Sequence, residues 1–272
     1  MNYRLKLVIR KLFIFCIIAW GGFVVWRLAF SNDLFESSAH GMTVQLSQGP
    51  FPVFIFPSKQ ATTRAIIIFG SGDGGWNTFE ESIGRACQEH GYELIGIDSE
   101  AYAKNDYDLA TLQSNFSIIA NKVRESFGAK APPLIVGGYS MGAAQAVAVA
   151  GGPHPPNGLV GLVVIDMLDR GRYGLRASDQ LNVLPTGPGT FGVEDFAGTM
   201  SRLRVVQWHA SEDSIDSTRW LDVLTAPHEE FTFPGVGHDY QDNREDFIRQ
   251  LIKSIGWILK DPEEEKGSTR DE

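Results

Sequence analysis

The sequence has few cysteines and no excess of positive charge. Its 272 residues include two cysteines, Cys16 and Cys87, and the formal net charge is −9. Cys16 lies in an apolar N-terminal run and Cys87 in a later helical pattern, so no intrachain disulfide is expected. Because nucleic-acid binding depends on Lys and Arg contacts to phosphate, the acidic balance argues against a nucleic-acid partner. No His, Asp and Cys residues share a metal-ligand spacing, so neither a metal nor an organic cofactor is expected.

Long apolar runs are lacking beyond the N-terminus. Residues 12–26 form an unbroken apolar run that follows four basic residues and precedes Arg27. Counted to residue 30, the run is long enough to span a bilayer. No small-residue cleavage site follows closely, so we expect residues 1–30 to be an uncleaved membrane anchor, with a cleaved signal segment as the alternative. The basic flank then places the later residues outside the cytoplasm.

The rest of the chain divides into one domain and a tail. Residues 40–260 are long enough to bury one sizeable core. Residues 261–272 (DPEEEKGSTRDE) are charged and carry no large apolar side chain. This composition predicts a disordered acidic tail.

Short apolar runs alternate with longer amphipathic ones along the domain. The strands are expected at residues 53–56, 64–69, 93–98, 134–139, 159–166, 203–209 and 230–233, and the helices at 76–90, 108–127, 141–150, part of 214–225, and 242–259. This alternation predicts an α/β fold whose mostly parallel central sheet carries helices on both faces. Residues 168–202 are rich in Gly and Pro and break the rhythm, which is typical of a lid or a binding loop.

A candidate nucleophile lies between one predicted strand and the helix that follows it. Residues 134–147 (LIVGGYSMGAAQAV) contain the pattern G-x-S-x-G at Gly138, Ser140 and Gly142. The pattern alone is a weak signal, and a structural turn with a solvent-facing serine is the alternative. Its place between an apolar strand and a small-residue helix indicates the nucleophile elbow of an α/β-hydrolase, with Ser140 as the nucleophile.

A serine nucleophile needs a base and an acid that orients the base. In α/β-hydrolases the acid precedes the histidine in the chain, after the serine. Asp213 follows the strand at 203–209, and His238 follows the strand at 230–233, so we expect these two residues to complete the triad. Asp166 and, more weakly, Asp216 are alternative acids, and His209 is an alternative base.

The glycine-rich residues 66–76 (IIIFGSGDGGW) allow two interpretations. Gly70, Gly72 and Gly75 have the G-x-G-x-x-G spacing of a dinucleotide site, and Asp98 at the end of the next strand imitates its ribose-binding acid. However, Asp73 would place a negative charge where the pyrophosphate lies.

The second interpretation places an oxyanion hole in the same loop. The α/β-hydrolases take one main-chain N–H from this loop and the other from the residue after the nucleophile. This order nominates the backbone of Gly72 or Asp73, together with the backbone of Met141. We therefore expect the loop to stabilise an oxyanion.

Three motifs resemble the AcvB/VirJ family of bacterial virulence-associated proteins, a branch of the α/β-hydrolases. They are SGDGGW at residues 71–76, GIDS at 96–99 with the following Tyr102, and GYSMG at 138–142. The resemblance covers roughly residues 66–151. The sequence departs from the family pattern after the elbow, where alanines and a glutamine replace the expected GYSFGADV and a following proline. The histidine region, GVGHDY, is only loosely similar.

The resemblance implies a location and a substrate. Members of the family are periplasmic or membrane-associated, which implies an inner-membrane anchor with a periplasmic catalytic domain, or a periplasmic protein if the N-terminal segment is cleaved. The implied activity is hydrolysis of the aminoacyl ester of aminoacylated phosphatidylglycerol, such as lysyl-phosphatidylglycerol. Asp73 would pair with a lysyl ammonium, Trp76 would line the site, and Arg170, Arg172 and Arg176 would meet the phosphate. A solvated face is the alternative for these arginines.

The sequence thus predicts a serine esterase of the cell envelope that acts on a lipid or a small ester. A generic carboxylesterase or lipase is the first alternative. The second is a non-catalytic periplasmic adaptor that binds envelope or secretion-system proteins, with the serine idle.

Overall fold

The computed structural model describes residues 40–179, 183–213, 217–238, 240 and 243–260. The chain divides into two units, Met1–Ser37 and Ser38–Glu272, and every described residue belongs to the second. The expected anchor at 1–30, the expected tail at 261–272 and the alternative acid Asp216 lie outside the described residues. Within the described ranges, the helices lack the combination of length and apolar character that crossing a bilayer requires.

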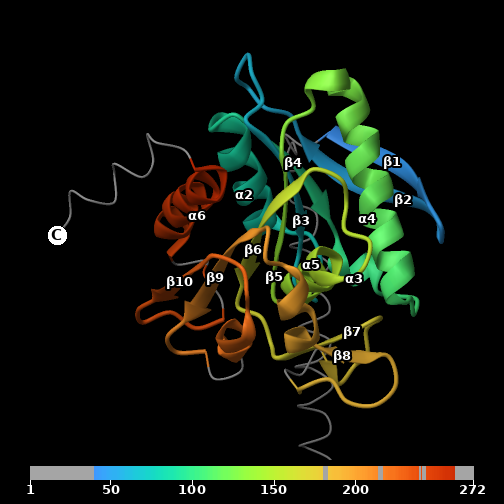
Figure 1. The fold of residues 1–272 in the computed structure, drawn as a ribbon, viewed down its shortest axis with the longest axis vertical. Helices are drawn as coiled ribbons and strands as arrows, with labels where there is room; N and C mark the ends of the chain where they lie inside the picture. The colour runs from blue at the N-terminus through green and yellow to red at the C-terminus, as the bar shows by residue number, and fades with distance from the viewer. Residues whose placement is uncertain (1–39, 180–182, 214–216, 239, 241–242, 261–272) are drawn as a thin grey trace, which may run out of the picture. The chain divides into compact units, whose positions relative to one another are not determined.

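An eight-stranded sheet forms the centre of the described part (Figure 1). Its strands in spatial order are β1 (His40–Leu46), β2 (Gly49–Phe56), β4 (Tyr92–Ile97), β3 (Ala65–Gly70), β5 (Leu134–Tyr139), β6 (Leu159–Ile165), β9 (Arg204–Ala210) and β10 (His228–Phe233). Strand β2 is antiparallel to both of its neighbours, and every pair from β4 to β10 is parallel. The carboxyl ends of β5, β6, β9 and β10 therefore share one edge of the sheet, where their following loops meet.

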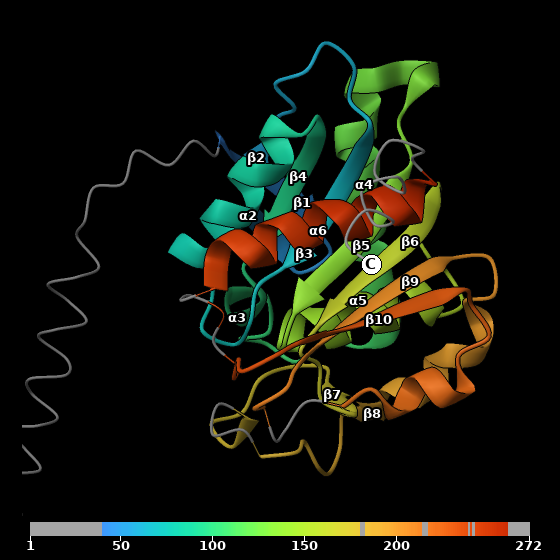
Figure 2. The same cartoon turned by 90° about the vertical axis from the view of Figure 1, so that its left-hand side faces the viewer.

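Helices cover both faces of this sheet. The α-helices are α2 (Thr78–Glu89), α3 (Ser99–Tyr102), α4 (Leu109–Arg124), α5 (Met141–Gly151) and α6 (Arg244–Leu259). Helices α4 and α5 share one buried apolar cluster with the sheet, and α2 and α6 share a second cluster on the opposite face (Figure 2). All six residues of β3 are buried because both of its faces are covered, which is the physical reason for its continuous apolar run.

Residues 168–202 contain regular structure within the described ranges. The antiparallel strands β7 (Arg170–Arg172) and β8 (Thr190–Gly192) pair with each other, and the 3₁₀ helix η3 (Val193–Thr199) follows. Helix η3 packs on α5 through Phe196, which is buried. The segment is therefore fixed to the helix that leaves Ser140.

Most expected elements occur within a few residues of their expected bounds. The apolar pattern did not indicate β1, α3, β7, β8 or η3. Residues 219–223 form the 3₁₀ helix η4 (Arg219–Val223) where part of an α-helix was expected. A further 3₁₀ segment, η1 (Glu125–Lys130), extends the end of α4. Strand β1 lies at the sheet edge and has mixed polarity, and its pairing with β2 rather than its own pattern makes it a strand.

Candidate active site

Ser140 occupies a strained turn between β5 and α5. Its backbone has φ 53° and ψ −115°, a conformation that costs free energy in a residue other than glycine. The turn is crowded, because a Cβ on Gly142 would lie 2.5 Å from the carbonyl of Gly70, and a Cβ on Gly138 would collide with Gly142. The Ser140 N–H donates to the carbonyl of Ile165 at 2.9 Å. This geometry is that of the expected elbow, and the two glycines are required by contact.

The loops after β9 and β10 bring His238 and Asp213 together. Imidazole Nδ1 lies 2.6 Å from Asp213 Oδ2, a short distance typical of a charge-assisted hydrogen bond. The Asp213 side chain is 4% exposed and that of His238 is 27% exposed. Two main-chain bonds tie the loops to each other: Ser211 N–H donates to Phe233 O, and Glu212 N–H donates to Val236 O, each at 2.9 Å. The acid is therefore buried and the imidazole keeps access to solvent.

A second carboxylate, that of Asp166, lies farther from the same imidazole. Its Oδ2 is 3.9 Å from His238 Nδ1, which is beyond hydrogen-bond length. Its Oδ1 accepts the N–H of Ala210 at 2.9 Å, and the residue is fully buried with φ 44°. Of the two acids, Asp213 is thus the one that can fix the imidazole tautomer. His209 lies in β9 and lines neither of the two cavities beside Ser140 and His238.

The side chains of Ser140 and His238 are not hydrogen-bonded to each other in the described part of the chain. Both lie beside the loop between β3 and α2. Asp73 lines a cavity with Ser140 and a second cavity with His238. Tyr139, next to Ser140, donates its hydroxyl to the carbonyl of His238, and the two rings are 5.0 Å apart. The motif GYSMG contains this tyrosine but did not indicate its contact with His238. Catalytic hydrogen bonds in ligand-free sites are often long and tighten when substrate binds.

The loop between β3 and α2 presents main-chain N–H groups to the same region. The N–H of Gly142 donates to Ser71 O at 3.1 Å, which fixes the loop against the elbow. Among the described residues, the N–H groups of Asp73 and Met141 have no hydrogen-bond acceptor, and both residues line the cavity that contains Ser140. This geometry fits an oxyanion hole made by Asp73 and Met141.

Glu80 in the first turn of α2 is a buried acid that sequence reasoning missed. Burial raises the pKa of Glu80 to about 7, and main-chain hydrogen bonds from Glu80 itself, Asn77 and Gly72 partly oppose the rise. Asp73 lines the cavity that contains Ser140, whereas Gly72 lines only the second of the two cavities, so Asp73 is the better oxyanion donor of the two residues expected from this loop. Glu80 also accepts the Asn77 N–H at 3.1 Å as part of a capping box.

The start of α2 does not suit a dinucleotide. Its N-terminus is already occupied by the side chains of Asn77 and Glu80, where a pyrophosphate would have to bind. A Cβ on Gly75 would lie 3.0 Å from the carboxylate of Glu100 and 3.3 Å from that of Asp98, so two acids face the loop. Asp98 caps α3 by accepting the N–H of Ala101.

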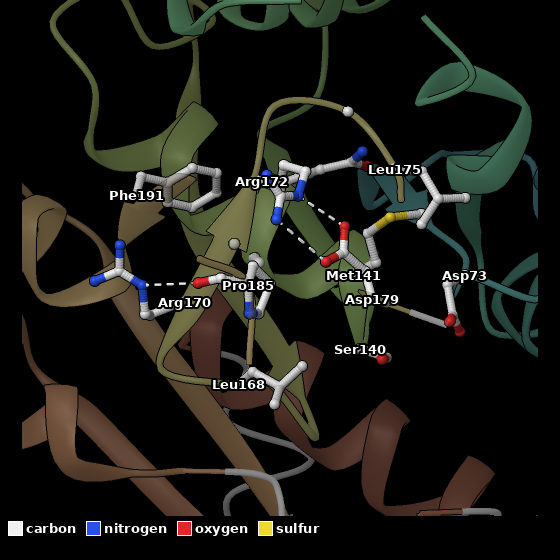
Figure 3. Close-up of a pocket in the computed structure, with 14 residues that line it drawn as sticks. Asp73, Ser140, Met141, Leu168, Arg170, Arg172, Leu175, Asp179, Pro185 and Phe191 are labelled. Atoms are coloured by element: carbon white, nitrogen blue, oxygen red, sulfur yellow. Dashed lines mark hydrogen bonds and ion pairs between the residues drawn. The ribbon is translucent and has the colours of Figure 1, made fainter. Parts of the chain in front are cut away.

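A cavity lies beside Ser140 (Figure 3). Its lining residues come from the oxyanion loop, the elbow, α5 and the segment 168–202: Asp73, Ser140, Met141, Ala144, Gln145, Leu168, Arg170, Gly171, Arg172, Gly174, Leu175, Asp179, Pro185 and Phe191. Figure 3 shows Asp73, Ser140 and Met141 at one side of it, with Arg170 and Phe191 at the other. The walls are mostly apolar, so the cavity suits an apolar group that carries few polar atoms.

The three candidate arginines hold the segment 168–202 together. Arg172 lies between Asp179, at 2.8 Å, and two carbonyls of the loop. Arg170 donates to Pro185 O and to Thr190 Oγ1. Arg176 makes a bidentate pair with Asp106 at the surface and does not line the cavity. Phosphate binding by any of them stays a prediction, and it would compete with these contacts.

Trp76 is half-buried, packs against the core and lines neither cavity. Its ring stacks on Phe54 at 4.9 Å with an interplanar angle of 14° and covers the Cα of Gly96. Its indole N–H donates to Glu81 at 3.3 Å. The structure therefore places this candidate substrate-binding residue in a packing role.

Asp166, Asp213 and His238 offer one ligand-type atom each within 4.8 Å of one another. Two zinc ligands, each about 2.1 Å from the ion, are separated by more than 3 Å. The 2.6 Å between His238 and Asp213 is too short for an ion between them and suits a shared proton. We therefore interpret the cluster as a hydrogen-bonded acid–imidazole pair.

The strand order, the elbow and the positions of acid and histidine define the class of fold, which is that of the α/β-hydrolases. A thermostable carboxyl esterase from Bacillus coagulans superimposes with a TM-score of 0.62 at 14% identity, over 81% of this chain and 99% of that one. An α/β serine hydrolase homologue from Coxiella burnetii gives 0.58 at 14%, over 79% and 96%. A monoglyceride lipase variant from Saccharomyces cerevisiae gives 0.56 at 16%, over 79% and 96%. The expected fold is confirmed.

A narrower similarity concerns the first part of the domain. Residues 64–150 match the family model described as bacterial virulence protein (VirJ), which confirms the resemblance over the oxyanion loop and the elbow. The match ends before Asp213 and His238. No curated protein matches the chain.

Proposed function

We propose that this chain is a serine esterase. Ser140 attacks an ester carbonyl, His238 takes the serine proton, and Asp213 orients the imidazole and stabilises its protonated form. The N–H groups of Asp73 and Met141 bind the oxyanion. The observation that carries this proposal is the 2.6 Å hydrogen bond between Asp213 and His238, at the sheet edge where Ser140 occupies its strained turn.

The two cavities suggest which part of the ester binds on each side of Ser140. The leaving group must receive its proton from the imidazole, so it lies on the side of the second cavity, which His238 lines with Tyr139 and Tyr240. The acyl group then lies in the cavity beside Ser140, which His238 does not line. After the alcohol departs, water activated by His238 releases the acyl group from Ser140.

The substrate that the family resemblance favours is the aminoacyl ester of aminoacylated phosphatidylglycerol. Asp73 supports this choice, since its half-buried carboxylate lines the acyl cavity and would attract an acyl group with an ammonium. Residues 1–30 would anchor the enzyme in the inner membrane, with the catalytic domain beside the lipid headgroups in the periplasm. Carboxylesterase or lipase activity on other esters is the broader form of the same proposal.

A fluorophosphonate probe tests the chemistry. Wild type is expected to become covalently labelled, and Ser140→Ala is expected to lose the label while keeping its fold. Absence of labelling in folded wild type would contradict the esterase and favour the adaptor.

A lipid comparison tests the substrate. Cells that overproduce the chain are expected to lose aminoacylated phosphatidylglycerol relative to cells that lack it. Unchanged lipid in both would contradict this substrate and leave the esterase standing. Asp73→Ala is expected to lower cleavage of lysyl lipid more than of alanyl lipid, and an unchanged ratio would remove the carboxylate from recognition.

A further inference from the structure

Gln145 lies in the acyl cavity on α5, the helix that follows Ser140. Its side chain is 1% exposed and contributes to the cavity lining. Its amide Nε2 donates to the hydroxyl of Tyr107 at 2.8 Å. Its Oε1 is buried and, among the described residues, has no hydrogen-bond donor. A buried carbonyl oxygen without a donor is unfavourable, so this atom requires an explanation.

The surroundings determine which way the amide of Gln145 points. The Tyr107 hydroxyl gives its own proton to the carbonyl of Arg172, at 3.4 Å. It therefore accepts from Gln145 rather than donating to it, which places Nε2 toward the tyrosine and Oε1 away from it. Burial raises the pKa of Tyr107, so the hydroxyl keeps its proton and this arrangement persists across the physiological pH range.

Among the described residues, no other polar group of the cavity donates to Gln145 Oε1. Asp73 and Asp179 are acceptors when ionised. The donors of Arg172 go to Asp179 and to the carbonyls of Thr186 and Pro188. Leu168, Leu175 and Phe191 contribute apolar walls. The described residues therefore leave this acceptor oxygen for a molecule in the cavity.

We propose that Gln145 Oε1 accepts a hydrogen bond from an N–H or O–H group within the acyl chain of the substrate. This inference rests on the proposed esterase and names the acyl class that it selects: chains with a polar hydrogen at a fixed distance from the ester carbonyl, in preference to plain fatty acyl chains. Gln145 is then a specificity residue, and Tyr107 is the positioning residue that turns its oxygen toward the substrate. The glutamine lies in the part of α5 where the sequence departs from the family pattern.

The test uses pairs of nitrophenyl esters that differ in one group. One member of each pair is the ester of an N-acetyl amino acid whose amide N–H is separated from the ester carbonyl by one to five carbons. The other member is the ketone in which CH₂ replaces that N–H. Wild type is expected to prefer the N–H member at one or more lengths by about tenfold or more in kcat/KM, because only that member satisfies the buried oxygen.

Variants assign the preference to Gln145. Gln145→Met has a similar volume and no acceptor oxygen, so the ratio is expected to fall to about one, mainly through slower cleavage of the N–H ester. Tyr107→Phe frees the amide to rotate and is expected to reduce the ratio in part. Gln113→Met is the matched control, because Gln113 is equally buried but bonded to Val149 O and His154 N–H outside the cavity. Its ratio is expected to equal that of wild type.

The outcomes separate the two proposals. Cleavage of both esters with equal kcat/KM at every length, or an unchanged ratio in folded Gln145→Met, overturns the role of Gln145 and leaves the esterase intact. If Gln145→Met does not fold, an unchanged ratio in Tyr107→Phe overturns it instead. Failure of wild type to cleave any of the esters, together with no Ser140-dependent fluorophosphonate labelling, overturns the esterase and the role of Gln145 with it.

Discussion

Asp213 and Asp166 both lie close to the imidazole of His238. Replacing each acid by asparagine in turn measures how much each contributes to catalysis. Asp213 Oδ2 lies 2.6 Å from His238 Nδ1 and Asp166 Oδ2 lies 3.9 Å from it. Asp213→Asn removes the negative charge and replaces one carboxylate oxygen with an NH₂ donor. The NH₂ group can donate to Nδ1, which favours the wrong imidazole tautomer. A loss of about 10³- to 10⁴-fold in kcat is expected, as for such changes in other serine hydrolases.

Asp166→Asn is expected to cost much less. The asparagine keeps an oxygen that accepts the Ala210 N–H, so the local fold is retained. What disappears is a negative charge at 3.9 Å, whose attraction to the protonated imidazole is about two thirds of that at 2.6 Å in the same dielectric. With an effective dielectric of about 20, this attraction is at most roughly 4 kcal/mol, and partial screening brings the expected loss in kcat to about 10- to 100-fold.

The assay is hydrolysis of a nitrophenyl ester under saturating conditions, with circular dichroism and urea unfolding to confirm that both variants fold. Asp169→Asn is a suitable control, because this residue also follows β6 but pairs with Arg219 instead of facing His238. If kcat fell equally in Asp166→Asn and Asp213→Asn, or fell more in Asp166→Asn, Asp166 would have a role in orienting His238. The assignment of the acid from its distance to Nδ1 would then be refuted.

Three further changes test other parts of the structure. Because burial raises the pKa of Glu80 from 4.5 to about 7, the unfolded chain loses this proton at a lower pH than the folded chain, and stability falls as pH rises between these values. The unfolding free energy of Glu80→Gln, measured in urea, is therefore expected to rise by roughly 3 kcal/mol relative to that of wild type between pH 4 and pH 8. Glu89→Gln, exposed on the same helix, is expected to show no such trend. If the stability of Glu80→Gln and that of wild type changed in parallel with pH, the buried acid would be refuted. Gly142→Ala is expected to lower kcat by about 100-fold or more, because its Cβ would lie 2.5 Å from the carbonyl that ends β3 and would displace both the elbow and the oxyanion loop; wild-type kcat in this variant would contradict the crowding. Trp76→Ala is expected to destabilise the fold by about 3 kcal/mol through loss of the Phe54 stack, with KM unchanged in folded protein. A raised KM with unchanged stability would instead indicate that Trp76 contacts the substrate.

The sequence was a good guide wherever one strand and its next turn carried the information. The elbow around Ser140 and the apolar strands are local features, because strain, glycine crowding and strand burial depend on neighbours within a few residues. The same holds for the position of His238 after a strand. Edge strand β1 escaped prediction because its mixed pattern becomes a strand only through pairing with β2.

Local sequence patterns could not assign the site residues where two or more segments offered a candidate for the same role. From sequence, Asp213 was the expected acid and Asp166 remained an alternative, because each follows a strand. The structure separates them by how the loops after β9 and β10 are bonded together. Trp76 was a plausible substrate contact until its packing on Phe54 was visible, and phosphate binding by the arginines stays a prediction. The arginines turn out to bind the carboxylates and carbonyls of their own neighbourhood.

By itself, the sequence determined the α/β-hydrolase fold and the order of serine, acid and histidine, since apolar periodicity and glycine placement act over short stretches of chain. Only the tertiary structure decided which acid touches the imidazole, which loop residue lines the cavity beside Ser140, and that the buried oxygen of Gln145 has no hydrogen-bond donor among the described residues. These are contacts between residues tens of positions apart. Their distances follow from how the strands align and the helices pack, a property that no single segment carries.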